Sequence, residues 1–83
     1  MSEPAFLHAE SGTVRFWVLI DGEEVGASVS PQSLHFRYRP DARNEDPLET
    51  YHANAAHIES VVRRRVAGGS LKPVLLREFD LRS

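Results

Sequence analysis

Four histidines are the side chains in this sequence best suited to metal binding or to general acid–base chemistry: His8, His35, His52 and His57. His52 and His57 are five residues apart, so on a helix they are separated by about 140° around the axis. Zinc-binding helices instead place two histidines four residues apart, on one face. The spacing therefore predicts surface or boundary histidines, with no metal site and no bound cofactor.

No recognised catalytic or nucleotide-binding motif accompanies the histidines. The chain has serines but no GxSxG pattern, and it has neither a GxGxxG sequence nor a P-loop. Three carboxylates, Asp21, Glu23 and Glu24, surround a predicted tight turn, where we expect water to solvate them. These observations favour a non-enzymatic protein. A small enzyme or ligand-binding domain is an alternative.

Six arginines form the other group that could bind a partner: Arg37, Arg39, Arg43, Arg63, Arg64 and Arg65. The last three are consecutive in a predicted helix, so they fan over about 200°. They could be a solvated helix end that suits the helix dipole. Alternatively, the six could form a basic patch for nucleic acid or an acidic partner. A net charge of −2 argues against a dedicated nucleic-acid-binding protein.

Size and composition indicate one α+β domain over residues 13–83, preceded by a tail or short lead-in strand over residues 1–12. The chain has no cysteine, which excludes a disulfide framework and a thiolate zinc site. No apolar run approaches the roughly 18 residues of a membrane span. The amino-terminal segment lacks the basic start and apolar core of a signal peptide. We therefore expect a cytoplasmic protein that does not contact the membrane.

A β-hairpin over residues 13–30 is the clearest structural signal in the chain. Asp21-Gly22 favours a two-residue type I′ turn, and β-branched and aromatic residues flank it on both sides. Such a turn dictates which residues face each other across the hairpin. On one face, the expected pairs are Val14–Val29, Phe16–Ala27 and Val18–Val25.

The other face of this hairpin pairs Arg15 with Ser28, Trp17 with Gly26 and Leu19 with Glu24. We expect the Trp17 ring to lie over Gly26, which has no side chain of its own. The large side chains on this face could be covered by the amino-terminal tail or by the neighbourhood of the carboxyl-terminal strand. Alternatively, Arg15, Trp17 and Leu19 form a contact surface for another protein or for a second copy of the chain.

Two helices and a closing strand are predicted after the hairpin. Ser30 and Pro31 begin a short helix of about two turns, and residues 37–46 form a polar loop. Asp46 and Pro47 begin one long helix that ends at Gly68-Gly69, with an apolar stripe of Leu48, Tyr51, Ala55, Ile58 and Val62. Residues 71–81 form the closing strand. The expected fold is a small antiparallel sheet, made of the hairpin and the carboxyl-terminal strand, with one long and one short helix packed on one face.

Four stretches resemble the small bacterial proteins grouped as domain of unknown function 1488. These proteins typically show VxFxVxVDGxxV, then IS-x-E-A-L, then FxxHRxxIE and finally LxxxD. The matching stretches are residues 14–25 (VRFWVLIDGEEV), 29–34 (VSPQSL), 51–59 (YHANAAHIE) and 74–81 (VLLREFDL). Ala53 and Asn54 stand where the family tends to show a histidine and a basic residue, and Pro31 replaces a more typical helix start. The resemblance implies an α+β domain of this size and assigns no activity.

Together these features predict a small non-enzymatic module that acts through protein contacts or regulates another protein, with homodimerisation as a further expectation. The residues expected to make the contacts are Arg15, Trp17 and Leu19. The first alternative is a nucleic-acid-associated regulatory protein that uses the arginines. The second is a small ligand-binding domain or enzyme.

Overall fold

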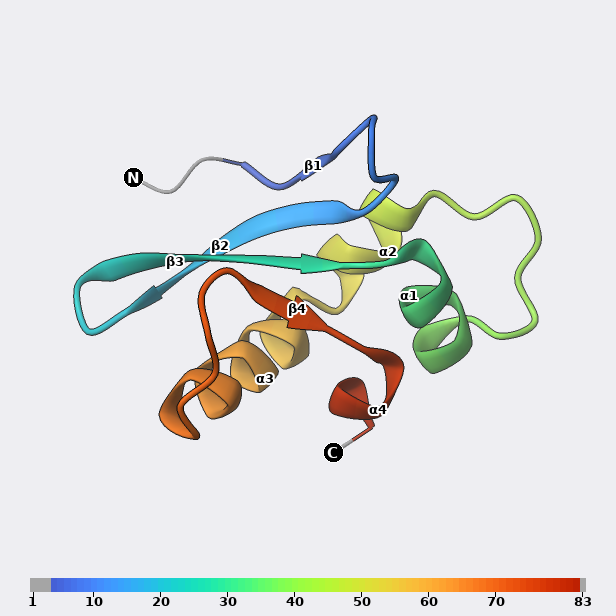
Figure 1. Cartoon of the computed structure of the whole chain (residues 1–83). Helices are drawn as coiled ribbons and strands as arrows, with labels where there is room; N and C mark the ends of the chain where they lie inside the picture. Colours follow the sequence, from blue (N-terminus) through green and yellow to red (C-terminus); the bar gives the residue numbers. More distant parts are fainter. Residues whose placement is uncertain (1–3, 83) are drawn as a thin grey trace.

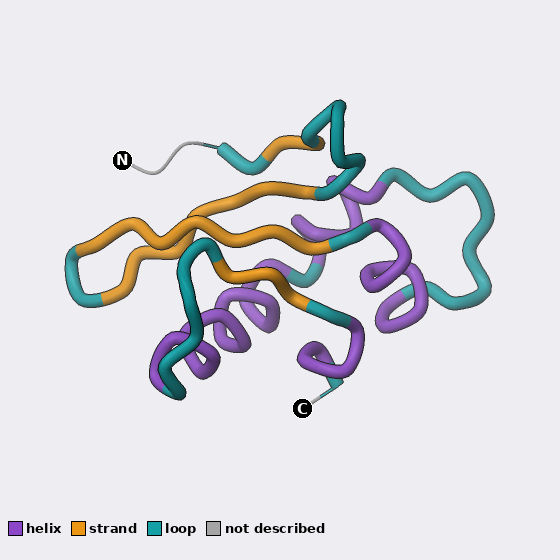
Figure 2. Tube along the Cα trace, viewed as in Figure 1, coloured by secondary structure: helices purple, strands orange, loops and turns teal. Residues whose placement is uncertain are grey.

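The computed structural model describes residues 4–82 and consists of a four-stranded sheet with helices on one face (Figures 1 and 2). Met1, Ser2 and Glu3 of the predicted lead-in segment, and Ser83, lie outside the described residues. The strand order in the sheet is β1-β2-β3-β4. The elements in chain order are β1 (Phe6–Leu7), β2 (Val14–Ile20), β3 (Glu23–Val29), α1 (Pro31–Tyr38), α2 (Pro47–Ala53), α3 (Ala55–Ala67), β4 (Val74–Leu76) and α4 (Glu78–Leu81).

The predicted hairpin is confirmed as β2 and β3, with the expected register. Val14 pairs with Val29, Phe16 with Ala27 and Val18 with Val25. Asp21 and Gly22 have φ angles of 51° and 80°, as a type I′ turn requires of its two central residues. Turn chemistry and side-chain alternation therefore select the same register.

The closing strand differs from the prediction in length and direction. β4 spans three residues, Val74–Leu76, and pairs with β3 in parallel, so the sheet is mixed rather than antiparallel. The chain leaves β3 at one end of the sheet, and the helices carry it back to the other end (Figure 1). Such a helical crossover is the connection that parallel neighbours require.

The predicted long helix is wrong in one respect, because it is divided into α2 and α3 at Asn54. The Asn54 side chain donates a hydrogen bond to the Thr50 carbonyl at 2.9 Å, and its backbone N–H bonds to the Tyr51 carbonyl. Asparagine side chains compete in this way for backbone partners that would otherwise continue a helix. Asn54 thus ends one helix and begins the next.

The segment after β4 is also helical rather than extended. The Asp80 carboxylate accepts a hydrogen bond from the Arg77 backbone N–H at 2.9 Å, which caps the first turn of α4. Leu81 is then fully buried, and its carbonyl accepts a hydrogen bond from Arg37 Nε at 2.7 Å. The short helix α4 therefore packs against α1 and closes the core. Helix α1 is the short helix that the sequence predicts after Ser30.

The core lies between the inner face of the sheet and the helices. Tyr51 on α2 packs on Phe16 with ring centroids 4.7 Å apart, and Ile58 on α3 is fully buried. Leu48 and Ala55, from the predicted apolar stripe, are only partly buried. The α+β class is confirmed. The buried apolar residues are Val14, Phe16, Val18, Val25, Ala27, Val29, Leu34, Tyr51, Ile58, Val61, Val62, Val74, Leu76 and Leu81.

Tyr51 makes the stability of this core sensitive to alkaline pH. Burial, with a smaller contribution from the Glu59 charge, raises the pKa of Tyr51 to about 12. In the unfolded chain a tyrosine has a pKa of about 10. Folding thus favours the neutral phenol, and this stabilisation is complete below pH 10 and is lost as pH rises towards 12. We expect the free energy of unfolding, measured by urea denaturation, to fall by about 1–3 kcal/mol across that interval.

The Tyr51→Phe variant provides the matched control, because it keeps the ring against Phe16 and has no phenol to ionise. It should retain most of its stability between pH 10 and 12. Equal alkaline losses in Tyr51→Phe and in the native chain would show that Tyr51 is not responsible.

Candidate interaction surface

The face of the sheet opposite the helices carries the three residues predicted to make contacts. Arg15, Trp17 and Leu19 alternate along β2 with the buried core residues Phe16 and Val18, so they point away from the helices. Leu19 is 57% exposed and Trp17 is half-buried. We call this surface the open face; it comprises Phe6, Arg15, Trp17, Leu19, Glu24, Gly26, Ser28, Pro73 and Leu75.

Three apolar residues join this surface from outside the hairpin. Phe6 pairs with Arg15 across β1 and β2, and its ring centroid lies 5.9 Å from that of Trp17. Leu75 pairs with Ser28 across β3 and β4 and is 62% exposed. Pro73, which precedes β4, lies beside Gly26. The amino-terminal segment thus covers part of Trp17, whereas Leu19 and Leu75 stay open.

The sequence does not assign these three residues to this face, although one of the two alternatives for it is that the amino-terminal tail or the neighbourhood of the carboxyl-terminal strand covers Trp17 and Leu19. Phe6 and Leu75 reach this face only because β1 and β4 take the two outer positions in the sheet. Val74, Leu75 and Leu76 are all apolar, so the sequence alone does not mark Leu75 as the exposed residue of the three. The difference appears only when β4 is known to pair with β3.

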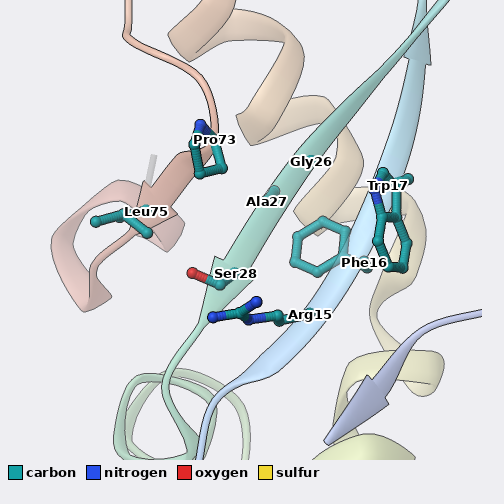
Figure 3. Close-up of a pocket in the computed structure, with 8 residues that line it drawn as sticks. All are labelled: Arg15, Phe16, Trp17, Gly26, Ala27, Ser28, Pro73 and Leu75. Carbon is teal, nitrogen blue, oxygen red and sulfur yellow. The ribbon is translucent and has the colours of Figure 1, made fainter. Parts of the chain in front are cut away.

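A shallow depression of about 220 Å³ runs along β3 on the open face. Its floor is at Gly26, where an added Cβ would lie 3.6 Å from Trp17 Nε1 and 3.8 Å from Pro73 Cβ. Figure 3 shows Trp17 on one side of β3, and Pro73 and Leu75 on the other. This confirms that the Trp17 ring lies beside Gly26, as the register predicts. The missing side chain of Gly26 creates the depression.

The polar groups along this depression are mainly hydrogen-bond donors. Arg15 extends towards Ser28 at one end (Figure 3). Among residues 4–82, no hydrogen-bond partner is found for the Arg15 guanidinium, the Trp17 indole N–H or the Ser28 hydroxyl. The depression therefore offers hydrogen-bond donors and apolar surface to a binding partner, and its lining contains no carboxylate or imidazole that could act as a general base.

Arg65 and Arg37, both members of the proposed basic patch, make internal contacts. Arg65 Nη1 donates to Asp80 Oδ2 at 2.7 Å, and its other terminal nitrogen donates to Ser70 Oγ at 3.1 Å. Arg37 bonds to the carbonyl of Leu81 through Nε, and its guanidinium lies 5.1 Å from the centre of the Tyr38 ring. Both side chains therefore stabilise the contacts of α4 with α3 and α1.

The structure does not bring the six arginines onto one surface. Arg39 and Arg43 are exposed in the loop between α1 and α2, and Arg63 and Arg64 are exposed on the last turns of α3. Figure 1 shows this loop and the end of α3 at opposite ends of the molecule, whose longest extent is 37 Å. A single phosphate backbone would meet only part of the set.

His8, His35 and His57 take part in separate local hydrogen bonds, whereas His52 is exposed and packs its ring edge-on against Tyr51. His35 Nδ1 bonds to Glu45, whose other carboxylate oxygen accepts a bond from buried Thr50 at 2.8 Å. Tyr38 Oη lies 2.7 Å from His57 Nδ1, and burial raises the pKa of Tyr38. Within the described part of the chain, no three His, Cys, Asp or Glu residues are grouped as metal ligands would be. The His35–Glu45–Thr50 chain instead fastens the end of the 39–46 loop to α1 and α2.

No helix within residues 4–82 has the length and apolar character needed to cross a membrane.

Comparison with known proteins gives one match. The family model described as "Protein of unknown function (DUF1488)" matches residues 5–74. This range includes the hairpin, the three helices that follow it and the first residue of β4. No curated protein and no solved structure matches the chain.

The Arg65–Asp80 contact should stabilise the fold strongly. The Asp80→Ala variant would leave the Arg77 N–H and one Arg65 donor without their acceptor in a site where Asp80 is only 9% exposed. We expect it to lose about 2–4 kcal/mol of unfolding free energy, measured by urea denaturation.

Glu78→Ala is the control for Asp80→Ala, because Glu78 forms a surface ion pair with Arg82 in the same short helix. Its cost should stay below about 1 kcal/mol. Similar losses in the two variants would contradict the assigned role of Asp80.

Proposed function

Because this chain belongs to the DUF1488 family, whose function is unknown, we propose a role from its own surface: a non-enzymatic module that binds another protein chain. The binding surface in this proposal is the open face. The observation that carries it is the exposed apolar area around Trp17, on the face of the sheet opposite the helices. Exposed apolar patches of this kind are typical of protein-binding surfaces.

The side chains on the open face have the composition of an interface. Tryptophan and arginine are enriched among residues that contribute most to binding energy. Arg15 and Trp17 lie two residues apart on β2, so they point to the same face of the sheet. The Phe6 ring beside Trp17 restricts its motion, so little side-chain entropy is left to lose on binding. Leu19 and Leu75 extend the apolar area on either side.

The alternatives receive less support from the arrangement of the residues. A nucleic-acid-binding role needs basic side chains on one surface, whereas the arginines lie at opposite ends of the molecule, and Arg37 and Arg65 make internal contacts. General acid–base catalysis usually relies on a carboxylate or an imidazole, and the residues that line the depression include neither.

Removal of the Trp17 side chain tests the proposal. The tagged native chain should capture protein from its own cell extract, in the presence and absence of nuclease. Trp17→Ala should reduce this capture by at least about tenfold, since a central aromatic anchor is typically worth 2 kcal/mol or more. The measurement is quantitative mass spectrometry of the captured proteins, including untagged copies of this chain.

Phe36→Ala is the matched control, because Phe36 is another exposed aromatic residue, 61% exposed, on helix α1. It should capture as much protein as the native chain does. Circular dichroism should show that both variants are folded. Capture that is unchanged in folded Trp17→Ala, or that nuclease abolishes, would contradict the proposal.

A further inference from the structure

The open face is electrically polarised along its strands. Arg15 and its cross-strand partner Ser28 lie at one end, and Leu19 and its partner Glu24 lie at the other; we call each such cross-strand pair a row. Arg15 and Glu24 are both exposed, and no ion-pair partner of either is found within residues 4–82. The two rows are four residues apart, which corresponds to about 13 Å along the strands. Trp17 and Gly26 occupy the row midway between them.

Neighbouring charges reinforce this polarity. Arg77 follows β4 at the same end as Arg15, because β4 runs parallel to β3. Exposed Asp21 lies in the turn at the Glu24 end. At that end, Lys72 is paired with Glu23 at 3.3 Å, so it offsets that carboxylate and leaves Glu24 uncompensated. The open face itself therefore carries Arg15 at one end and Glu24 at the other; exposed Glu10 lies beyond the Arg15 end, in the loop between β1 and β2.

From this polarity we infer that the partner is a second copy of this chain, with the two open faces stacked and their strands antiparallel. This inference rests on the protein-binding role proposed above for the same face. The two copies would be related by a two-fold axis that lies between the two sheets, perpendicular to the strands, at the Trp17 row. This axis places the Arg15 end of each copy over the Glu24 end of the other. Every contact then occurs twice, as in an isologous dimer.

The same charges disfavour a stacking in which the two-fold axis runs along the strands. Such an axis would place the Arg15 end of one copy over the Arg15 end of the other and the Glu24 end over the Glu24 end, and like charges brought together in this way cost several kcal/mol in interfaces. In the antiparallel arrangement, Leu19 of one copy instead lies over the row of Arg15, whose aliphatic stem is an apolar surface. Electrostatic and apolar contacts therefore favour one orientation.

The size of the open face sets the expected strength of the dimer. β2 and β3 have seven residues each and are about 23 Å long, whereas β1 has two residues and β4 has three. With about 4.8 Å of width per strand, the flat area is about 300 Å², well below the ~800 Å² per partner of a standard stable interface. We therefore expect a reversible dimer with a dissociation constant in the micromolar range, on the order of 1–100 μM.

Trp17 provides a direct probe, because it is the only tryptophan in the chain. Dilution of the native chain from about 1 mM to 0.1 μM, a range that brackets the expected dissociation constant, should shift its fluorescence emission to longer wavelength as the open face meets water. Sedimentation equilibrium should show the mass falling from that of two chains to that of one over the same range.

Charge reversal identifies the orientation. Arg15→Glu and Glu24→Arg should each weaken the dimer by about tenfold or more, because each substitution replaces two attractive contacts with repulsive ones. The double variant Arg15→Glu/Glu24→Arg should recover the native dissociation constant to within about threefold. An equimolar mixture of the two single variants should form a mixed dimer, in which opposite charges face each other again.

Arg43→Glu is the matched control, since Arg43 is an exposed arginine in the loop away from the open face, and it should leave the dissociation constant unchanged. A native chain that stays monomeric at 1 mM would overturn the inference. So would single reversals without effect, or a double variant without recovery. If the monomer still captures a different protein through Trp17, the protein-binding role stands and only the second copy is rejected. A monomer whose Trp17 emission responds to an oligonucleotide would reject both.

Discussion

The register of the β2–β3 hairpin is the constraint on which the rest of this structure depends. Only two residues, Asp21 and Gly22, connect the strands, and their positive φ angles allow this tight turn. A slip of one residue between β2 and β3 would set Phe16 and Val18 opposite Ser28 and Gly26 instead of Ala27 and Val25. The turn therefore decides which side chains form the core and which are left on the open face.

The helices then complete one side of this sheet and leave the other side open. Asn54 divides the helical segment so that α2 places Tyr51 on Phe16 while α3 buries Ile58, Val61 and Val62. Asp80, held by Arg65, folds the carboxyl-terminal turn and buries Leu81. These contacts use the polar residues Asn54, Asp80 and Arg65 to stabilise the fold, so they are not available to bind a partner.

The open face combines exposed apolar area with fixed charges at its two ends, and neither contributes to the core of the fold. Its centre is apolar around Trp17, exposed Leu19 and Leu75 extend this apolar area, and Arg15 and Glu24 lie at its two ends, with no ion-pair partner for either among residues 4–82. Apolar area supplies binding energy, and fixed charges supply orientation. A second copy of the same face satisfies both requirements at once, which is the physical basis of the proposed dimer.

Local sequence determined the hairpin, its register, the cap at Ser30 and the α+β class, because turn and capping chemistry act between neighbouring residues. Membership of the DUF1488 family was also evident from sequence motifs. Only the tertiary structure decided the parallel direction of β4, the helix break at Asn54 and the helical turn at Glu78–Leu81. In each case the deciding contact joins segments far apart in the chain, or a side chain competes with a regular backbone pattern. Phe6 and Leu75 joined the candidate surface for the same reason, since strand order brings them beside Trp17 and Ser28.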